Sequence, residues 1–397
     1  MRTPRPDVST LTATLVGMVG LAAAMGIGRF AFTPLLPLMQ ERFGLSLLQG
    51  GYLASANYLG YLAGALLCVA PGLAPRLLVR LGLVGVALLT AAMGLRNGFA
   101  AWTVLRFLAG VASAMVFIGV SAWTLSVLDP AERGPRSGWI YAGVGLGVAL
   151  AGLVGVGVGA FGLHPSVGWL GLGAAAALVA AGVWRPLSIA PGAGAVPMMA
   201  APARLGREGW RLVLCYGALG FGYIIPATFL PAAARALVND PTVFGWTWPV
   251  FGLAAALSTV VTATLWRNAA PRKVWAASQL VMAVGVLAPA LQMNLFTLLL
   301  SALCVGGTFM VMTMAGMQEA RRVGGAGAPR LIAAMTTALA MGQLVGPLTV
   351  RAADSVAEAI RAPSVLAAAL LLLSTLLLMA GRGTSVSSMF NTTGNSP

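Results

Sequence analysis

Long runs of apolar residues alternate with short charged or Pro- and Gly-rich joints along almost the whole chain. A helix needs about 20 apolar residues to cross roughly 30 Å of hydrocarbon, and twelve runs approach that length. The predicted spans are residues 11–37, 48–69, 77–95, 101–125, 138–161, 167–183, 211–237, 244–265, 274–290, 295–317, 331–350 and 365–380. The pattern therefore predicts an all-α integral membrane protein with twelve transmembrane helices.

A long polar joint at residues 185–208, rich in Pro, Ala and Gly, separates the first six spans from the second six. This composition is typical of a loop between two bundles. We therefore expect an N-terminal six-helix bundle over residues 1–184, a linker over 185–209 and a C-terminal six-helix bundle over 210–382. Residues 383–397 are rich in Ser, Thr and Asn, which predicts a disordered tail.

The composition excludes two other classes of protein. Of the 397 residues, 59% are hydrophobic and only 8% are charged. Soluble domains carry about 25% charged residues, so this chain cannot cover a water-facing surface. Its three cysteines, Cys68, Cys215 and Cys304, all lie in apolar runs, where free thiols pack as small hydrophobic side chains. A soluble fold and a disulfide-stapled scaffold are both excluded.

The positive charge is distributed in a way that indicates topology. The formal net charge is +15, but the basic runs are short and lack interleaved aromatic residues, which argues against nucleic-acid binding. With the amino terminus inside, 17 of the 24 Lys and Arg residues lie on the inner side, as the positive-inside rule requires. All ten tryptophans lie near predicted helix ends, where their rings favour the membrane boundary. We predict an inner-membrane protein with both termini and the linker in the cytoplasm.

The two sets of spans also carry an internal repeat at an offset of 194 residues or close to it. The matched positions are 26–29 with 220–223, 36–37 with 230–231, Gly110 with Gly306, and Gly152 with Gly346. The alternative is chance matching in Gly- and Ala-rich helices. A duplication predicts two pseudo-symmetric halves around a central cavity that opens alternately to either side, as in secondary transporters.

Several motifs resemble those of the major facilitator superfamily of transporters. Residues 106–110 (RFLAG) are similar to its membrane-embedded Arg followed by Gly in the fourth helix, and residues 130–138 resemble its charged loop after that helix. Residues 143–152 are similar to an exporter-associated glycine motif, although Val148 replaces the usual Pro. Pro75 stands where the family usually has an Asp that takes part in a charge relay with neighbouring helices, so this chain departs from the family pattern at that position. The resemblance implies the major facilitator fold and a small-molecule substrate.

A closer resemblance is carried by two longer segments. Residues 26–37 (GIGRFAFTPLLP) and 54–61 (ASANYLGY) resemble the YbfB/YjiJ branch of that superfamily. These segments are long and unusual enough to be fairly specific. The resemblance sharpens the expected fold, but it implies no particular substrate.

Two arginines, Arg29 and Arg106, lie inside predicted spans. An arginine near the bilayer centre costs about 2.5–3.5 kcal/mol on insertion scales, so it normally faces a watery cavity or a partner. At 1.5 Å per residue, the two lie roughly 12 Å and 8 Å below the outer helix ends. The resembled fold places both helices beside the cavity, so the two guanidiniums could converge on one anionic group. The alternatives are snorkelling to the outer headgroups and a structural hydrogen bond to helix carbonyls.

Uncharged polar residues complete the predicted substrate site. Asn57 and Tyr61 are four residues apart and share one helix face. Tyr223 is the repeat equivalent of Arg29, and Gln343 is a further polar residue within a span. For Asn57 and Gln343 the alternative is an interhelical hydrogen bond that fixes packing. The predicted substrate-binding residues are Arg29, Arg106, Asn57, Tyr61, Tyr223 and Gln343. Tyr223, Gln343 and Tyr141 are weaker candidates than Asn57 and Tyr61, and packing is the favoured role of Tyr58 and Tyr141.

The remaining titratable residues exclude other chemistry within the membrane. All nine Asp and Glu residues fall in loops or at predicted helix ends, and His164, the single histidine, falls in an outer loop. An embedded proton relay is therefore not expected, and Ser121 has no base that could make it a hydrolytic nucleophile. The sequence contains no cluster typical of a metal site, so we expect no enzyme activity and no cofactor.

These features predict a secondary transporter that moves a small organic solute, and an organic anion in particular, by alternating access. If transport is coupled, the substrate brings its own proton or two anions exchange. Efflux of amphipathic compounds is an alternative, motivated by the glycines at residues 143–152. A non-transporting membrane receptor or scaffold is a second alternative, although the chain lacks a long soluble extension. The sequence leaves the substrate, the direction of transport, the coupling ion and the oligomeric state open.

Overall fold

The computed structural model describes residues 8–68, 74–95, 98–189 and 205–380, and these residues form helices and their connections without a strand. The N-terminal half comprises α1 (Thr10–Leu21), η1 (Ala22–Ile27), α2 (Phe32–Phe43), α3 (Leu47–Leu67), α4 (Pro75–Met93), α5 (Phe99–Val127), α6 (Pro130–Ala160) and α7 (Pro165–Ile189). The C-terminal half comprises α8 (Arg207–Leu237), α9 (Pro241–Phe244), α10 (Thr247–Leu265), α11 (Pro271–Leu291), α12 (Leu295–Gly324), η2 (Gly325–Gly327), α13 (Ala328–Leu348) and α14 (Val356–Ala380). The predicted disordered tail and most of the predicted linker lie outside the described residues.

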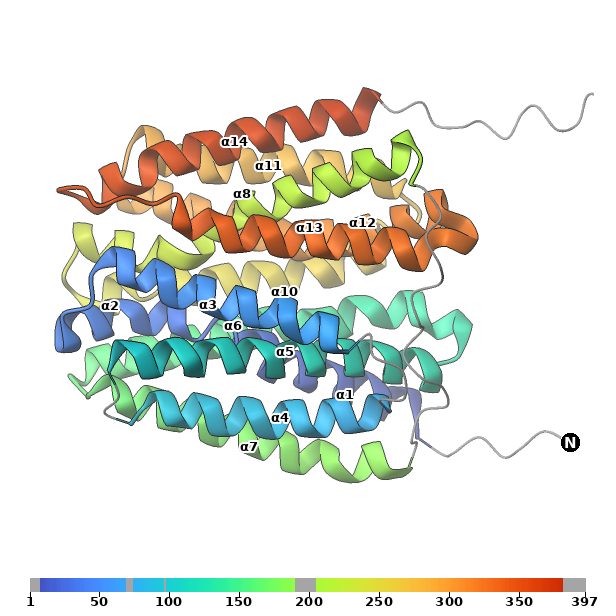
Figure 1. Cartoon of the computed structure of the whole chain (residues 1–397), viewed down its shortest axis with the longest axis horizontal. Helices are drawn as coiled ribbons and strands as arrows, with labels where there is room; N and C mark the ends of the chain where they lie inside the picture. Colours follow the sequence, from blue (N-terminus) through green and yellow to red (C-terminus); the bar gives the residue numbers. More distant parts are fainter. Residues whose placement is uncertain (1–7, 69–73, 96–97, 190–204, 381–397) are drawn as a thin grey trace, which may run out of the picture.

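Eleven helical segments are long and apolar enough to cross a membrane, with α1 to α2 forming one crossing and α9 with α10 another. The twelfth helix is α3, whose 21 residues span about 31 Å at 1.5 Å per residue. It lies alongside α5 (Figure 1). Its lower hydropathy reflects polar residues such as Ser55 and Asn57, which are buried within the protein. The predicted all-α fold with twelve helices is confirmed.

The two halves pack in the same way. In the N-terminal half, α1 packs on α6, α3 on α5, and α4 on both α5 and α7. In the C-terminal half, α8 packs on α13, α10 on α12, and α11 on both α12 and α14. The halves contact each other through α3 with α13 and through α6 with α10. The repeat relates α3 to α10 and α6 to α13, so these two contacts are equivalent. The molecule is therefore two pseudo-symmetric six-helix bundles.

Glycines at repeat-equivalent positions explain the close approach of two helix pairs. A Cβ atom on Gly110 of α5 would lie 2.1 Å from the carbonyl oxygen of Asn57 on α3. A Cβ atom on Gly306 of α12 would lie 2.4 Å from the carbonyl oxygen of Phe251 on α10. Both distances are far below van der Waals contact, so only glycine fits at either position without moving a helix. The duplication predicted from the sequence thus has a direct structural counterpart.

The first crossing is broken, whereas the sequence predicted one continuous helix. In η1 the hydrogen bonds widen to a π-helix, and the N–H of Gly28 donates to the carbonyl of Ala23 at 2.9 Å. The chain then turns before α2 begins. Gly26 in η1 lies directly against α6, because its Cβ atom would lie 2.2 Å from the backbone of Gly147. The break exposes backbone carbonyls, including that of Arg29, to side-chain donors.

Several helices extend further than predicted. Residues 130–138 were expected to form a charged loop, but they are the first turns of α6. Pro130 occupies the first helical position, where its missing N–H costs nothing, and Glu132 pairs with Arg136 at 3.0 Å one turn later. Helix α7 likewise continues to Ile189, into the predicted linker. A proline-led start therefore carries α6 beyond the apolar core, whereas α7 extends beyond it at its carboxyl end.

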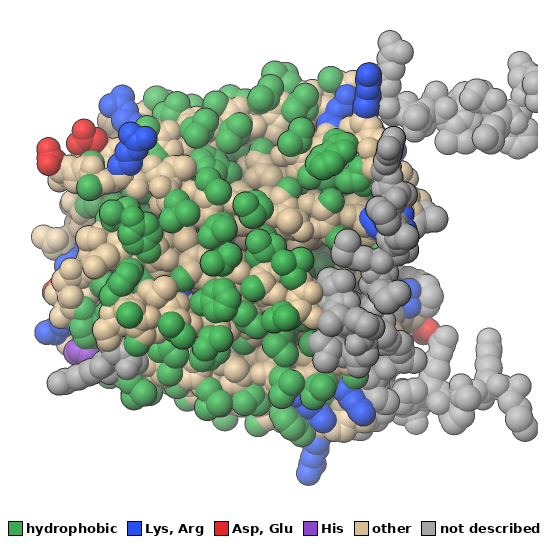
Figure 2. All heavy atoms as spheres, viewed as in Figure 1, with side chains coloured by type: hydrophobic (Ala, Val, Ile, Leu, Met, Phe, Trp, Pro, Cys, Tyr) green, Lys and Arg blue, Asp and Glu red, His purple; other side chains and the backbone are tan. Residues whose placement is uncertain are grey.

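The two ends of the molecule contain different chain segments, because α1 begins and α14 ends at the same end (Figure 1). We call the end where α1 begins and α14 ends the terminal side, and the opposite end the far side. Hydrophobic side chains cover the middle of the face in view, while Lys and Arg gather at the two ends (Figure 2). This is the distribution expected for a bundle whose waist is surrounded by lipid.

One acidic residue is buried within a helix, contrary to the prediction that all lie in loops or at helix ends. Glu319 is 0% exposed in α12, which runs five residues beyond it. It accepts hydrogen bonds from the Nε of Arg272 at 2.9 Å and of Arg322 at 3.0 Å. Arg272 also pairs with Glu208, which pairs with Arg211 at 2.5 Å. These five residues form an ion cluster on the terminal side that joins α8, α11 and α12.

Candidate functional site

Arg29 follows the C-cap residue of η1, Gly28, and its side chain is buried between the two bundles at 2% exposure. Its guanidinium donates a hydrogen bond to the Oε1 of Gln343 on α13. Its Cζ lies 4.4 Å from the ring centre of Tyr61 and 5.0 Å from that of Tyr58, both on α3. All of these partners are neutral, and the Nε has none. Arg29 therefore faces protein rather than lipid or headgroups.

Gln343 connects Arg29 to its repeat equivalent. The Nε2 of Gln343 donates to the hydroxyl oxygen of Tyr223 at 2.5 Å, and both side chains are buried. The ring of Tyr223 stacks on Phe309 of α12, with the two ring centres 5.3 Å apart. The side-chain amide of Gln343 thus connects Arg29 of the N-terminal bundle to Tyr223 of the C-terminal bundle, and these two residues are equivalent in the internal repeat.

Arg106 and Asn57 hold the break in the first crossing. Arg106 donates from one guanidinium nitrogen to the carbonyl of Arg29 at 2.8 Å and from another to that of Gly28 at 3.3 Å. The Nδ2 of Asn57 donates to the carbonyl of Arg106 at 2.9 Å. Both side chains are buried. In this conformation Arg106 makes the carbonyl contact that the sequence left as an alternative, and Asn57 makes an interhelical hydrogen bond.

The structure thus divides the six predicted residues into two groups. Arg29, Tyr61, Tyr223 and Gln343 form one cluster where α3, α8 and α13 face the first crossing. Arg106 and Asn57 lie on the N-terminal-bundle side of the break and donate to the carbonyls of Arg29 and Gly28 in its backbone. The two guanidiniums are therefore not both free donors in this conformation, because two donor groups of Arg106 are already used by carbonyls.

Sequence reasoning assigned Tyr58 to packing and did not consider Phe309. The ring of Tyr58 contacts Arg29, and its hydroxyl lies 3.3 Å from the hydroxyl of Thr228 on α8. Tyr58 is three residues before Tyr61 on the same helix, so the same spacing argument that selected Asn57 and Tyr61 could have found it. Phe309 carries no polar signal and becomes visible only through its contact with Tyr223.

The far side is closed by contacts between the bundles. The hydroxyl of Thr33 donates to the carbonyl of Ala227 at 2.8 Å, and these residues are 194 positions apart. Arg235 of α8 forms an ion pair with Glu41 of α2 at 3.1 Å. The hydroxyl of Ser55 on α3 donates to a carbonyl of α13 at 3.1 Å. The first crossing and α3 are thereby attached to α8 and α13.

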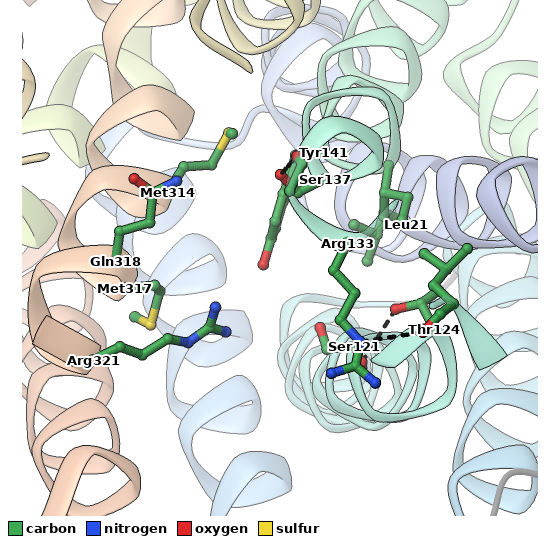
Figure 3. A pocket seen from close by; sticks show the side chains of 13 residues that line it. Leu21, Ser121, Thr124, Arg133, Ser137, Tyr141, Met314, Met317, Gln318 and Arg321 are labelled. Atoms are coloured by element: carbon green, nitrogen blue, oxygen red, sulfur yellow. Dashed lines mark hydrogen bonds between the residues drawn. The ribbon is translucent and has the colours of Figure 1, made fainter. Parts of the chain in front are cut away.

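On the terminal side the bundles leave a cavity of about 470 Å³. Its walls come from α1, α5 and α6 of the N-terminal bundle and from α12 of the C-terminal bundle; they include Leu21, Ser121, Tyr141, Met314 and Met317. In Figure 3, the α12 side chains approach from one side of the space and those of α5 and α6 from the other. Among the described residues, contacts between the bundles therefore close the far side, and a cavity remains on the terminal side.

Comparison with known proteins gives the family. The model of a family described as "Uncharacterised MFS-type transporter YbfB" matches residues 21–379. The chain belongs to this family. The match confirms the resemblance carried by the segments at residues 26–37 and 54–61, and it makes the chain a multi-pass membrane protein of the MFS type.

A curated relative supports the same family over a shorter stretch. The chain is 30% identical over 142 residues to "Uncharacterized MFS-type transporter YceJ" of Bacillus subtilis (strain 168). The aligned segment covers 34% of this chain and 35% of that protein. The chain thus matches about a third of the relative's length, and this relative carries no substrate in its name.

Proposed function

We propose that this MFS family member is a secondary transporter in the bacterial inner membrane that moves a small organic anion by alternating access. In this proposal Arg29 binds the anion together with Tyr61, Tyr223 and Gln343. Arg106 and Asn57 contribute by holding the backbone that presents Arg29.

The observation that carries the proposal is the lack of a counter-ion for two buried arginines. Arg29 and Arg106 are each 2% exposed, and their described hydrogen-bond partners are an amide oxygen and backbone carbonyls. Within the described ranges, no carboxylate pairs with either. Taking a cation out of water costs several kcal/mol unless an opposite charge balances it. A transported anion would supply that balance, which is why we assign the site to anions.

Arg29 is well placed to couple binding to movement of the bundles. It belongs to the N-terminal bundle, while Gln343 and Tyr223 belong to the C-terminal bundle. A substrate carboxylate is a stronger acceptor than the neutral Gln343 amide, so it would take over the donor on Arg29. The exchange would release one of the contacts between the bundles. Gln343 and Tyr223 would then be free to bind other polar groups of the substrate.

The positive-inside distribution supports an orientation with the terminal side in the cytoplasm. The described conformation would then be inward-open, with the far side facing the periplasm. Alternating access requires the opposite state, in which the contacts of Thr33, Ser55 and Arg235 break and the walls of the cavity close.

A second candidate function is efflux of amphipathic compounds. The cavity walls combine Met314, Met317 and Leu21 with polar groups. Methionine is flexible and polarizable, so such walls accommodate apolar ligands of various shapes. This candidate predicts that neutral amphipathic compounds are transported as well as anions are.

A two-step experiment tests the proposal. A thermal-shift screen of the purified protein against mono- and dicarboxylates and their neutral amides first identifies ligands, because a ligand that binds only the folded state raises stability. Counterflow of each hit is then measured in proteoliposomes. We expect carboxylates, but not the amides, to bind and exchange. Equal binding of the amides would favour the amphipathic alternative over the anion proposal.

The Arg29→Gln variant decides the role of the arginine. Hydrogen bonds to charged groups contribute about 1.5–3 kcal/mol, so the affinity for the anion should fall about 10- to 100-fold. Arg29→Lys should show a smaller loss, because lysine keeps the charge but not the planar fork. Arg351→Gln is the matched control, since Arg351 is exposed. Wild-type affinity and counterflow in Arg29→Gln would remove Arg29 from the site.

A further inference from the structure

The ends of α4 and α7 on the terminal side carry three arginines and no acid. Arg76 and Arg80 lie one helical turn apart near the start of α4, and Arg185 lies near the end of α7. Neither helix contains an Asp or a Glu. Figure 2 shows Lys and Arg side chains along the lower edge of the terminal side, which is where α4 begins and α7 ends in Figure 1. We call the three residues the α4–α7 arginine site.

Several other arginines on the terminal side are balanced by carboxylates. Arg136 pairs with Glu132 at 3.0 Å, and the arginines of the ion cluster on α8, α11 and α12 pair with its two glutamates. Among the described residues, Arg76, Arg80 and Arg185 form no ion pair. The positive charge of the α4–α7 arginine site is therefore available to an anion from outside the chain.

Arg80 is held in place by the end of α7. Its Nη2 donates to the carbonyl oxygen of Trp184 at 2.8 Å and to the hydroxyl of Ser188, and its Cζ lies 4.5 Å from the centre of the Trp184 ring. Arg80 and Trp184 each lie roughly 8 Å inside the end of their helix, at 1.5 Å per residue. This is the depth of the membrane boundary, where tryptophan rings and long arginine side chains reach polar headgroups. Both hydrogen bonds use Nη2, so the donors on Nη1 remain for an anion held at this depth.

The surface beside the arginines is apolar and exposed. A stripe of exposed side chains follows one face of α4 at helical spacing: Leu77, Leu81, Val84 and Leu88. On α7, the side chain of Trp184 is 44% exposed. A ligand that lies here contacts positive charge at the helix ends and apolar side chains further into the membrane. A phospholipid carries its phosphate and its acyl chains in that same order, whereas a soluble anion would leave the apolar stripe uncovered.

We propose that the α4–α7 arginine site binds one anionic phospholipid, with Arg76 and Arg185 on either side of Arg80 at the headgroup and the exposed stripe of α4 along an acyl chain. The net negative charge of the headgroup distinguishes this lipid from a zwitterionic one, because basic side chains near the membrane surface attract anionic lipids. The bound lipid joins the ends of α4 and α7, the two helices that Arg80 already links. The site lies on the outer surface of the N-terminal bundle and does not depend on Arg29.

The test is a native mass spectrometry titration of the full-length protein in detergent, which gives the Kd of the first bound lipid. The probes are dioleoyl phosphatidylglycerol and dioleoyl phosphatidylcholine, which share their acyl chains and differ in net charge. Phosphatidylglycerol should bind more tightly, and Arg76→Gln and Arg185→Gln should each raise its Kd about fivefold. The double variant should raise it about 25-fold. Both arginines are exposed, so these substitutions leave the packing of α4 on α7 in place. An equal Kd for the two lipids, or a wild-type Kd in the double variant, would overturn the proposal.

Two controls separate a lipid site on α4 and α7 from general attraction to a positive surface. Arg267→Gln is the matched variant, because Arg267 is exposed on the same side and follows the exposed Trp266, as Arg185 follows Trp184, but belongs to the C-terminal bundle. It should keep the wild-type Kd, and a rise equal to that in Arg185→Gln would overturn the site. Glycerol 1-phosphate, which lacks acyl chains, should not displace phosphatidylglycerol at equal concentration. Displacement would assign the arginines to a soluble phosphate and overturn the assignment to lipid.

Discussion

Arg29 and Arg272 are both arginines with little exposure, but their surroundings differ completely. Arg272 is 9% exposed on the terminal side and is paired with the carboxylates of Glu208 and Glu319. Arg29 is 2% exposed between the bundles and contacts the amide of Gln343 and aromatic rings. The desolvation cost is offset by opposite charge at the first site and by neutral dipoles at the second.

The difference separates a structural role from a binding role. A cation that is already paired has little to gain from an incoming anion, so the ion cluster of Arg272 is suited to fixing α8, α11 and α12 together. A cation with neutral partners gains strongly from an anion, so Arg29 is suited to binding one. Substitutions at the two places should therefore change different measured quantities.

The largest expected effect is at the ion cluster. Glu319→Gln removes the charge that pairs with Arg272 and Arg322, and breaking a buried ion pair from one side costs about 3–5 kcal/mol. The free energy of unfolding in mixed micelles should fall by that amount, while anion affinity in the folded fraction stays unchanged. Glu358→Gln is the control, since Glu358 is exposed. An unfolding free energy equal to that of the Glu358→Gln variant would show that the cluster does not stabilise the bundle.

The next effect is at the break in the first crossing. Arg106→Met removes the donors to the carbonyls of Gly28 and Arg29, and leaving a buried carbonyl unpaired costs about 1–3 kcal/mol. Both stability and anion affinity should fall, because the backbone that presents Arg29 loosens. Arg361→Met, an exposed position, serves as the control for the substitution itself. Reduced affinity with full stability would instead mean that Arg106 contacts the anion directly.

A smaller effect is expected at the hydroxyl that accepts from Gln343. Tyr223→Phe keeps the ring that stacks on Phe309 but removes the oxygen 2.5 Å from the Gln343 Nε2. A net hydrogen bond contributes about 1 kcal/mol, so anion affinity should change by roughly fivefold. The direction is informative: weaker binding places the hydroxyl at the substrate, whereas tighter binding shows that it holds Gln343 against Arg29. An anion affinity equal to that of the wild type would show that the hydrogen bond between Gln343 and Tyr223 plays no part in anion binding.

The smallest effect is at the far-side ion pair, which is partly exposed. Glu41→Arg and Arg235→Glu should each weaken the contact between the bundles by less than about 1 kcal/mol. Each single variant should increase labelling of a cysteine placed on the far side of the Arg29 site, and the double variant with exchanged charges should restore protection. If the exchange restores nothing, the pair does not close the far side.

The sequence predicted the crossings, the duplication and the position of two arginines inside apolar spans, because these follow from local hydropathy and from repeated spacing. It did not predict the break at η1, which depends on Gly26 meeting Gly147 on a distant helix. It also assigned Glu319 to a loop or helix end after the span at residues 295–317, and it did not predict that this carboxylate is buried within α12 beside Arg272 and Arg322. The binding roles of Arg29, Arg106, Asn57, Tyr61, Tyr223 and Gln343 stay predictions.

The cavity residues show a similar limit. Arg133 and Arg321 lie 188 positions apart in two segments that the sequence assigned to cytoplasmic loops. Only the extension of α6 and α12 beyond their apolar cores brings both onto the walls of one space. Counting charges along the sequence identifies such residues, but it does not show that two of them line the same cavity.

The pair formed by Glu41 and Arg235 joins two equivalent positions of the internal repeat. These residues are 194 positions apart, so each occupies the place of the other in the duplicated unit. In a symmetric dimer of two identical halves, that place would lie opposite its own copy, and any charge there would repel itself. In this chain the two equivalent positions carry opposite signs and attract each other, which two identical halves could not do at this position.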